Sequence, residues 1–158
     1  MTKAPSILMT MPGALLFTKN GEWVHDGTVV THPGVQRYFS THLRFSEEHG
    51  GYVIEVEGKC VRVEIEDTPH VVRSIDTTAL PWHIRLETGQ SEPFRPETFS
   101  VGTDNVFYCR DKDNAWLRIL RPAAQTLVRY IEEGPTGVAM LVCCGGEFRI
   151  AVRNESPD

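Results

Sequence analysis

The sequence has no excess of positive charge. Its 158 residues include 16 Lys and Arg against 21 Asp and Glu, a net charge of −5 at neutral pH. Proteins that hold phosphate backbones or anionic lipids without regard to sequence need clustered Lys and Arg. We therefore expect no nucleic-acid partner. Such a surface would need the scattered arginines to gather on one face: Arg37, Arg44, Arg62, Arg73, Arg85 and Arg95.

Long apolar runs and closely paired cysteines are also absent. The apolar stretch within residues 1–14 is bracketed by Pro5 and Pro12 and is too short for a signal-peptide core or a membrane span. The four cysteines (Cys60, Cys109, Cys143 and Cys144) lack C-x-x-C spacing, and neighbouring strand residues point to opposite faces. Unpaired cysteines fit a reducing compartment. We expect a cytosolic protein without membrane association.

Motifs that would name a reaction are missing. The six histidines show neither H-x-x-x-H nor H-E-x-x-H spacing, and there is no G-x-S-x-G segment. The glycine pairs at 50–51 and 145–146 precede expected strands, whereas phosphate-binding loops precede helices. We predict neither a metal nor a cofactor, and we favour a protein that is not an enzyme.

An internal repeat is the most informative feature present. Residues 35–39 (VQRYF) correspond to residues 127–131 (LVRYI) at an offset of 92, and Trp23 corresponds to Trp116 at an offset of 93. Self-similarity at a nearly fixed offset is typical of a duplicated structural unit. At this length, two small halves would share a core, because either half alone would bury too little surface.

Turn signals divide each copy into hairpin, helix and hairpin. Asn20-Gly21 predicts a two-residue turn that puts Phe17 opposite Val24. Gly58-Lys59 and Gly145-Gly146 predict the later hairpins, and the apolar spacing predicts helices that begin near Thr31 and near Pro122. The segment 139–144 is apolar on both faces, which indicates a central strand, a doubly covered strand or a dimer contact.

These elements predict an α+β fold: a duplicated β-β-α-β-β unit with mostly antiparallel sheets, one helix per unit and extra strands between the copies. Two connecting strands are expected at residues 70–75 and 82–87, followed by an irregular segment, TGQSEPFRPET. The expected divisions are an N-terminal segment 1–14, a first unit 15–66, connecting strands and a loop 67–105, a second unit 106–152 and a tail 153–158.

The segments NGEWVHDGTVVTHPGVQRYFSTHL and GGYVIEVEGKCVRVEIEDTP resemble the bacterial domain-of-unknown-function family 1285. The resemblance covers mainly residues 20–69 and is carried by Gly21, Trp23, Gly27, Phe39, Leu43, Gly51, Tyr52, Glu66, Asp67 and Pro69. The chain departs from the family pattern at Thr31-His32 and at the EVEGKC stretch. The resemblance implies a folded, cytosolic bacterial protein with no assigned chemistry.

Several residues are candidates for contacts with a ligand. Trp23 could form an aromatic platform aided by His25 and Arg37, although burial in the core is the stronger expectation for a repeated tryptophan. The irregular segment offers Phe94 and Arg95. The acidic cluster Glu64, Glu66 and Asp67 with His70 could serve acid–base chemistry or hold a weak cation, but turn hydrogen bonding is the stronger expectation.

Two functional hypotheses follow from the expected fold and these candidate residues. The first is a non-enzymatic binding or protein-interaction module that takes a protein segment at an open sheet edge, or a small ligand between the halves. An open edge would equally support a homodimer. The alternative is a small hydrolase or metal-dependent enzyme that uses Glu64, Glu66, Asp67 and His70.

Overall fold

The structure is a computed structural model that describes residues 14–56 and 58–153. The expected N-terminal segment and C-terminal tail lie outside these residues, apart from Ala14 and Arg153. The chain divides into two compact units, Met1–Pro69 and His70–Asp158, and each is described by itself. Among the described residues, no helix has the length and apolar character needed to cross a bilayer.

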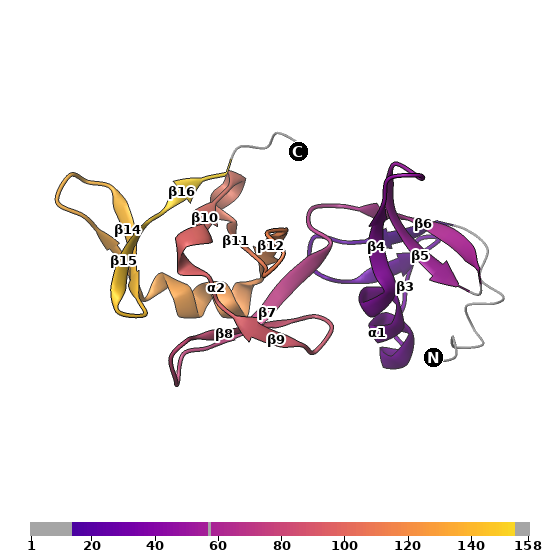
Figure 1. Cartoon of the computed structure of the whole chain (residues 1–158), viewed down its shortest axis with the longest axis horizontal. Coiled ribbons are helices and arrows are strands. Elements are labelled where there is room, and N and C mark those ends of the chain that lie inside the picture. Colours follow the sequence, from indigo (N-terminus) through magenta and orange to yellow (C-terminus); the bar gives the residue numbers. More distant parts are fainter. Residues whose placement is uncertain (1–13, 57, 154–158) are drawn as a thin grey trace. The chain divides into compact units, whose positions relative to one another are not determined.

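The first unit forms one sheet with a helix beside it (Figure 1). Its described elements are β1 (Leu15–Phe17), β2 (Trp23–His25), β3 (Thr28–Val29), α1 (Pro33–His42), β4 (Leu43–Ser46), β5 (Gly51–Val56) and β6 (Lys59–Ile65). The strand order is β3-β2-β1-β6-β5-β4, in which β1 and β6 are parallel. The two edges of this sheet are therefore β3 and β4.

The register of the first hairpin decides which residues enter the core. Phe17 pairs with Trp23, so the predicted pairing of Phe17 with Val24 is wrong and the loop spans residues 18–22. A shift of one residue exchanges the two faces of a strand. Trp23 consequently faces the core with Phe17, and both are almost fully buried.

Trp23 lies at the centre of an aromatic cluster. Its ring centroid is 5.0 Å from that of Phe17 and 5.1 Å from that of Phe39 on α1. The indole Nε1 donates a hydrogen bond to Ser40 Oγ at 2.8 Å. A buried indole N–H is costly unless it has an acceptor, so Ser40 makes this position suitable for tryptophan.

The second unit contains two sheets and a helix. Its described elements are β7 (His70–Asp76), β8 (His83–Leu86), β9 (Ser91–Pro93), η2 (Pro96–Thr98), β10 (Ser100–Val101), η3 (Thr103–Asn105), β11 (Phe107–Arg110), β12 (Trp116–Ile119), α2 (Arg121–Val128), β13 (Ile131–Glu133), β14 (Ala139–Cys143), β15 (Gly146–Arg149) and β16 (Ala151–Val152). One sheet has the order β16-β10-β11-β12-β7-β8-β9, and the other has the order β13-β14-β15.

Helix α2 joins the two sheets of this unit into one core. Ala123 and Leu127 of α2 belong to a buried cluster that includes Leu117 of β12 and Leu141 of β14. Each of these side chains is at most 1% exposed. The apolar stripe of α2 therefore packs against the large sheet while the small sheet covers it, as the spacing of its apolar residues predicted.

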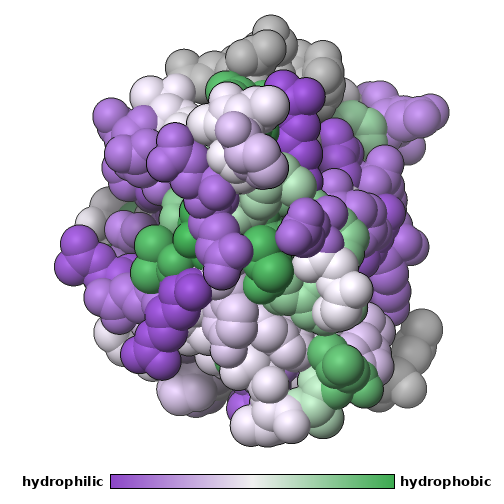
Figure 2. Space-filling view, turned by 90° about the vertical axis from the view of Figure 1, so that its left-hand side faces the viewer, coloured by the Kyte–Doolittle hydropathy of each residue, from purple (hydrophilic) through white to green (hydrophobic). Residues whose placement is uncertain are grey.

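Strand β14, which is apolar on both faces, is the central strand of the small sheet. Its inner face carries Leu141, whereas Met140 and Val142 on the outer face are half-buried. The space-filling view of the side where β14 and β15 lie shows apolar surface among hydrophilic side chains (Figure 2). Glu132 and Glu147 line one hollow together with Met140 and Val142.

Both helices end earlier than the sequence predicted. A strand follows α1 directly, and two residues separate α2 from the next strand. The apolar spacing that predicts the two helices extends to Leu43 and Ile131, but Leu43 begins β4 and Ile131 begins β13. Gly134-Pro135, a pair that typically ends a helix, lies instead in the turn after β13. Apolar residues spaced for a helix also suit a strand over so short a stretch.

The α+β class and the mostly antiparallel sheets are confirmed, with two α-helices in the described part of the chain. The pairs β1–β6, β7–β12 and β10–β16 are the parallel ones. Sheet connectivity differs between the units: β6 pairs with β1 in the first, whereas β13-β14-β15 stands as a separate sheet in the second.

Candidate functional site

A tight turn creates the open edge of the first sheet. Asp26 and Gly27 both have positive φ, 47° and 83°, and His25 pairs with Thr28 on either side of them. Two positive φ values between paired residues define a type I′ turn, whose twist suits a hairpin. The turn brings β3 back along β2 and leaves its other side as the sheet edge.

The backbone of Val29 points toward this edge. In an antiparallel pair, residues that exchange hydrogen bonds alternate with residues that do not. The amide of Val30 donates to the carbonyl of Trp23 at 2.8 Å, so the preceding pair, Val24 and Val29, is of the second kind. The N–H and C=O of Val29 are consequently directed away from β2.

Helix α1 begins immediately beyond this edge. Pro33 occupies its first turn, and His32 is the N-cap, with Nδ1 accepting a hydrogen bond from the Val35 amide at 3.2 Å. Because Nδ1 accepts, the ring proton of neutral His32 lies on Nε2. The Gln36 side chain donates to the Val30 carbonyl at 2.7 Å, which fixes the helix to the end of the strand.

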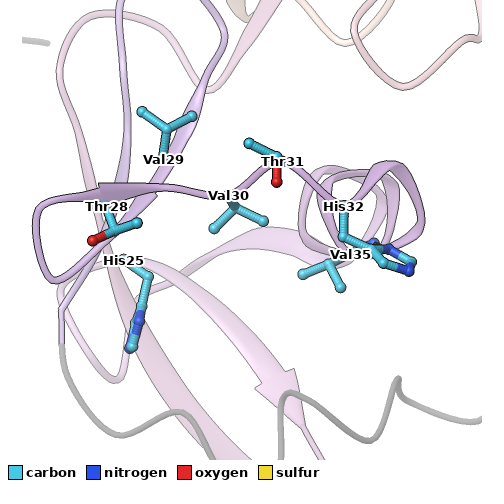
Figure 3. A pocket seen from close by; sticks show the side chains of 7 residues that line it. All are labelled: His25, Thr28, Val29, Val30, Thr31, His32 and Val35. Carbon is cyan, nitrogen blue, oxygen red and sulfur yellow. Dashed lines mark hydrogen bonds between the residues drawn. The ribbon is translucent and has the colours of Figure 1, made fainter.

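A pocket of about 230 Å³ lies between β3 and the start of α1. It is lined by His25, Thr28, Val29, Val30, Thr31, His32 and Val35, and Figure 3 shows Val29 and Val30 on opposite sides of the chain, as strand alternation requires. Val35 is buried, whereas Val29 is 45% exposed. The lining is therefore mostly apolar, with an imidazole at each end.

The size of the pocket limits what it can hold. Sites for drug-sized molecules and cofactors occupy roughly 300–1,000 Å³, and this pocket is smaller. Among the described residues, its lining includes no carboxylate and no cysteine, so these residues offer no metal ligands beyond two histidines. A single apolar side chain fits its volume and its chemistry best.

Comparison with known proteins identifies the fold. No protein-family model and no curated protein matches the sequence. A DUF1285 family protein from Silicibacter pomeroyi DSS-3 is similar over 96% of this chain and 90% of its own, with a TM-score of 0.67 and 17% identity. The chain has the DUF1285 fold. A second DUF1285 protein, from Shewanella baltica OS155, covers 74% of this chain and 91% of its own length with a TM-score of 0.58 and 17% identity.

The DUF1285 fold was anticipated from residues 20–69, and the likeness to the first of these structures extends over nearly the whole chain. The family designation carries no activity. Function must therefore be inferred from the geometry of this chain's own residues.

Within the DUF1285 fold, the stronger expectation for Trp23, burial in the core, is confirmed, and the alternative aromatic platform does not form. Trp23 is 2% exposed and packs in the core, so it is not available to a ligand. His25 does line the pocket, where its side chain is 19% exposed and lies 3.7 Å from Asp26. Arg37 is exposed on α1 and is not among the lining residues.

Phe94 and Arg95 support the structure of the segment once expected to be irregular. Phe94 is 4% exposed, and its amide donates to the Trp82 carbonyl at 2.7 Å. Arg95 donates to the Asp111 carbonyl at 2.7 Å. The segment contains β9 and the short helix η2, so these two side chains stabilise a compact region.

Within the acidic cluster, Glu66 bonds to the loop of the first hairpin. Glu66 Oε1 accepts a hydrogen bond from the Lys19 amide at 2.8 Å, Asp67 is half-buried and Glu64 is exposed on β6. Across the described residues, no group of three or more His, Cys, Asp or Glu is arranged to hold a metal ion. The partner of His70 in the structure is Glu87, which sequence reasoning did not identify.

His70 and Glu87 form a partly buried ion pair. His70 Nδ1 lies 2.9 Å from Glu87 Oε2, and the other carboxylate oxygen accepts from the Val71 amide at 2.8 Å. The Glu87 side chain is only 2% exposed. Burial alone would lower the pKa of His70, but the hydrogen bond and charge of Glu87, with the charges of Asp111 and Glu92, outweigh it and raise the pKa above 6.5.

Cys109 and Cys143 are buried and pack in the core of the second unit. Cys109 is fully buried, and burial strongly raises the pKa of its thiol. Burial and the neighbouring Cys144 also raise the pKa of Cys143, to about 12. A thiol is nucleophilic only when ionised, so neither of these groups is set up for covalent catalysis.

Proposed function

We propose that this chain is a non-enzymatic binding module that takes an extended segment of a partner protein at the edge of β3. The segment would add as a further strand, and one apolar side chain would enter the pocket between β3 and α1. The observation that carries this proposal is the position of the pocket directly beside the outward-facing backbone of Val29.

Strand addition divides recognition between backbone and side chains. The hydrogen bonds to an edge strand supply affinity that is independent of sequence, and pockets for alternate side chains supply specificity. Val29 offers one outward donor and one outward acceptor, which pair with the partner's backbone. An apolar anchor buried next to them contributes about 1.5–3 kcal/mol, or roughly tenfold to a hundredfold in affinity.

The short edge favours a linear segment over a second copy of this chain. Strand β3 has only two residues, and a stable protein–protein interface buries roughly 1,200–2,000 Å². A hydrogen-bonded pair this short, with one pocket, suits a flexible segment that contributes a single anchor. Self-association through the same edge is the competing outcome.

Selection from a random-peptide phage library tests the proposal. The library is passed over the full chain and, separately, over Val29→Pro, which removes the outward N–H but no β2–β3 ladder hydrogen bond. Val29→Thr is the matched control, because it alters the side chain and keeps the amide. We expect peptides that share one apolar position to be enriched on the native protein and on Val29→Thr only.

Three outcomes would overturn the proposal. Failure to enrich any common sequence would contradict it, as would equal enrichment on Val29→Pro. A dimer of the native protein in sedimentation experiments that dissociates in Val29→Pro would replace the partner segment with a second copy.

We also propose that residues 15–66 and 106–152 arose by duplication. Each of these segments contains an antiparallel strand pair, then a helix, then a three-stranded antiparallel meander, with β3 as an extra strand in the first. The corresponding helix residues Val35 and Leu127 are both 1% exposed. Their shared burial supports the sequence correspondence, whereas Trp23 is buried and Trp116 is only half-buried beneath Arg110.

The compartment is part of the same proposal. All four cysteines are free, as expected in a reducing environment. This supports a cytosolic location, and the bacterial sources of the two DUF1285 structures support a bacterial protein.

A further inference from the structure

The outer strands of the large sheet in the second unit carry a polar hollow that is separate from the β3 edge. It has a volume of about 370 Å³ and is lined by Ser74, Asp76, His83, Arg85 and Ser91. These residues come from β7, β8 and β9. All five lining residues are exposed, so the hollow is an open polar depression on the face of the sheet.

The lining residues form two rows across the sheet. Ser74, Arg85 and Ser91 are direct cross-strand partners, and Asp76 pairs with His83 in the next row. Residues two apart on one strand share a face and lie about 7 Å from each other. One row therefore presents hydrogen-bond donors, and the other presents a carboxylate and an imidazole.

The donor row is unengaged within the described part of the chain. Arg85 makes no ion pair and no hydrogen bond there, and neither serine hydroxyl has a hydrogen-bond partner. A guanidinium binds a carboxylate through two parallel hydrogen bonds. The flanking serine hydroxyls add two further donors on either side of the arginine.

The second row is prepared to accept hydrogen bonds. Asp76 Oδ1 accepts from the amide and hydroxyl of Thr78 at 2.9 and 2.6 Å, which leaves Oδ2 for the hollow. These bonds and the nearby His83 lower the pKa of Asp76, so it is ionised near neutral pH. His83 Nδ1 donates to the Pro81 carbonyl at 2.9 Å, so the neutral ring keeps an acceptor at Nε2.

We infer that this hollow binds the zwitterionic head of a small amino-acid-like ligand, with its carboxylate on Arg85 and the serines and its ammonium on Asp76 and His83. The two opposite charges share one hollow without pairing to each other. A ligand that carries both charges satisfies both rows, whereas a simple anion meets the Asp76 carboxylate. None of these residues lines the β3 pocket, so this inference stands apart from the proposed function.

Nuclear magnetic resonance titration of the full chain with the standard free amino acids, each at millimolar concentration, tests the inference. Any amino acid that shifts the amides of β7–β9 is then compared with its N-acetyl and methyl-ester derivatives. We expect each derivative to bind roughly tenfold or more weakly, because each lacks one charge. Inorganic phosphate serves as the simple-anion probe.

Two variants test which side chain binds the carboxylate of the ligand and which binds its ammonium group. Arg85→Gln should weaken the free amino acid by roughly tenfold or more. Asp76→Asn keeps an acceptor for Thr78, and it should bind the free and N-acetyl compounds equally. Arg149→Gln, an exposed arginine on the other sheet, is the control and should bind like the native protein. Thermal unfolding confirms that each variant is folded.

The inference is overturned if no free amino acid shifts these amides, or if Arg85→Gln binds as well as the native protein. It is equally overturned if phosphate binds better than every amino acid and Asp76→Asn strengthens that binding, since the hollow would then be a simple anion site.

Discussion

The side-chain amide of Gln36 donates a hydrogen bond to the Val30 carbonyl at 2.7 Å, joining the first helix to the end of the open edge strand. The bond is part-buried and connects two elements that share the pocket. It fixes the spacing between Val30 and the buried Val35, and hence the width of the space available to an apolar side chain.

Replacing Gln36 with Met should weaken the attachment of Val30 to helix α1. The variant keeps the length of the side chain and removes the donor, at a cost of about 1 kcal/mol. We expect hydrogen exchange of the Val30 amide, which is bonded to the Trp23 carbonyl, to accelerate roughly fivefold, with the free energy of unfolding reduced by no more than about 1 kcal/mol. Gln125→Met, on the exposed face of the second helix, is the control. Unchanged exchange of the Val30 amide would show that the Gln36 hydrogen bond does not hold this side of the pocket.

Gly34 leaves room for the histidine cap. A Cβ at this position would lie 2.9 Å from His32 Cε1 and 3.2 Å from Nδ1, so Gly34→Ala should displace the capping ring. Gly to Ala in a helix normally stabilises by about 1 kcal/mol, and loss of a cap costs about the same. We expect little net change in the native background and a gain of about 1 kcal/mol in a His32→Ala background, measured by urea unfolding. Equal effects in both backgrounds would contradict the steric coupling.

Ser40 supplies the buried acceptor for Trp23. Ser40 is 3% exposed, and Ser40→Ala leaves the indole N–H without its partner. We expect a loss of about 1–3 kcal/mol in the free energy of unfolding. Adding Trp23→Phe removes the donor as well, so the Ser40→Ala penalty should be much smaller in a Trp23→Phe background. Penalties that simply add would show that this hydrogen bond is not the cause.

The ion pair between His70 and Glu87 should make stability depend on pH. The pKa of His70 is raised in the folded protein. The stabilisation is therefore present in full below the unfolded pKa of 6.5 and is lost as the pH rises through the folded pKa. His70→Asn should cost about 2 kcal/mol or more in acid, because Glu87 is left buried without its charged partner, and less in alkali.

The matched control is Glu87→Gln, which keeps an acceptor for the Val71 amide. In urea unfolding, the free energy of unfolding of this variant should fall less between about pH 6 and pH 9 than that of the native protein. This interval covers about the width of one histidine titration. A native protein whose stability is flat over that interval would contradict the assignment.

The faces of most strands could be predicted from sequence, whereas registers could not. A two-residue turn at Gly58-Lys59, as predicted, would place Ile54 opposite Val63, but Ile54 pairs with Val61. A shift of two residues keeps the same side chains inward, so this face was correct despite the error. At the first hairpin the shift was one residue, so the predicted turn register placed Trp23 on the wrong face, whereas its expected burial was correct.

The pocket was missed although a signal for it was present. Asp26-Gly27 between the apolar residues Val24 and Val29 is a strong hairpin pattern, and assigning it would have created β3 and its open edge. The hydrogen bond from Gln36 could not be foreseen, because it depends on where the helix begins. The partner of His70 was within reach, since pairing the strands expected at residues 70–75 and 82–87 brings Glu87 beside it.

The most direct test of the binding account is residue-resolved amide hydrogen exchange with and without a peptide selected on the native protein. Strand addition at β3 predicts that the outward amide of Val29 becomes strongly protected, while the amide of Val30, already bonded to Trp23, changes little. Protection confined to other parts of the chain, with Val29 exchanging as fast as in the free protein, would show that partners do not bind at this edge.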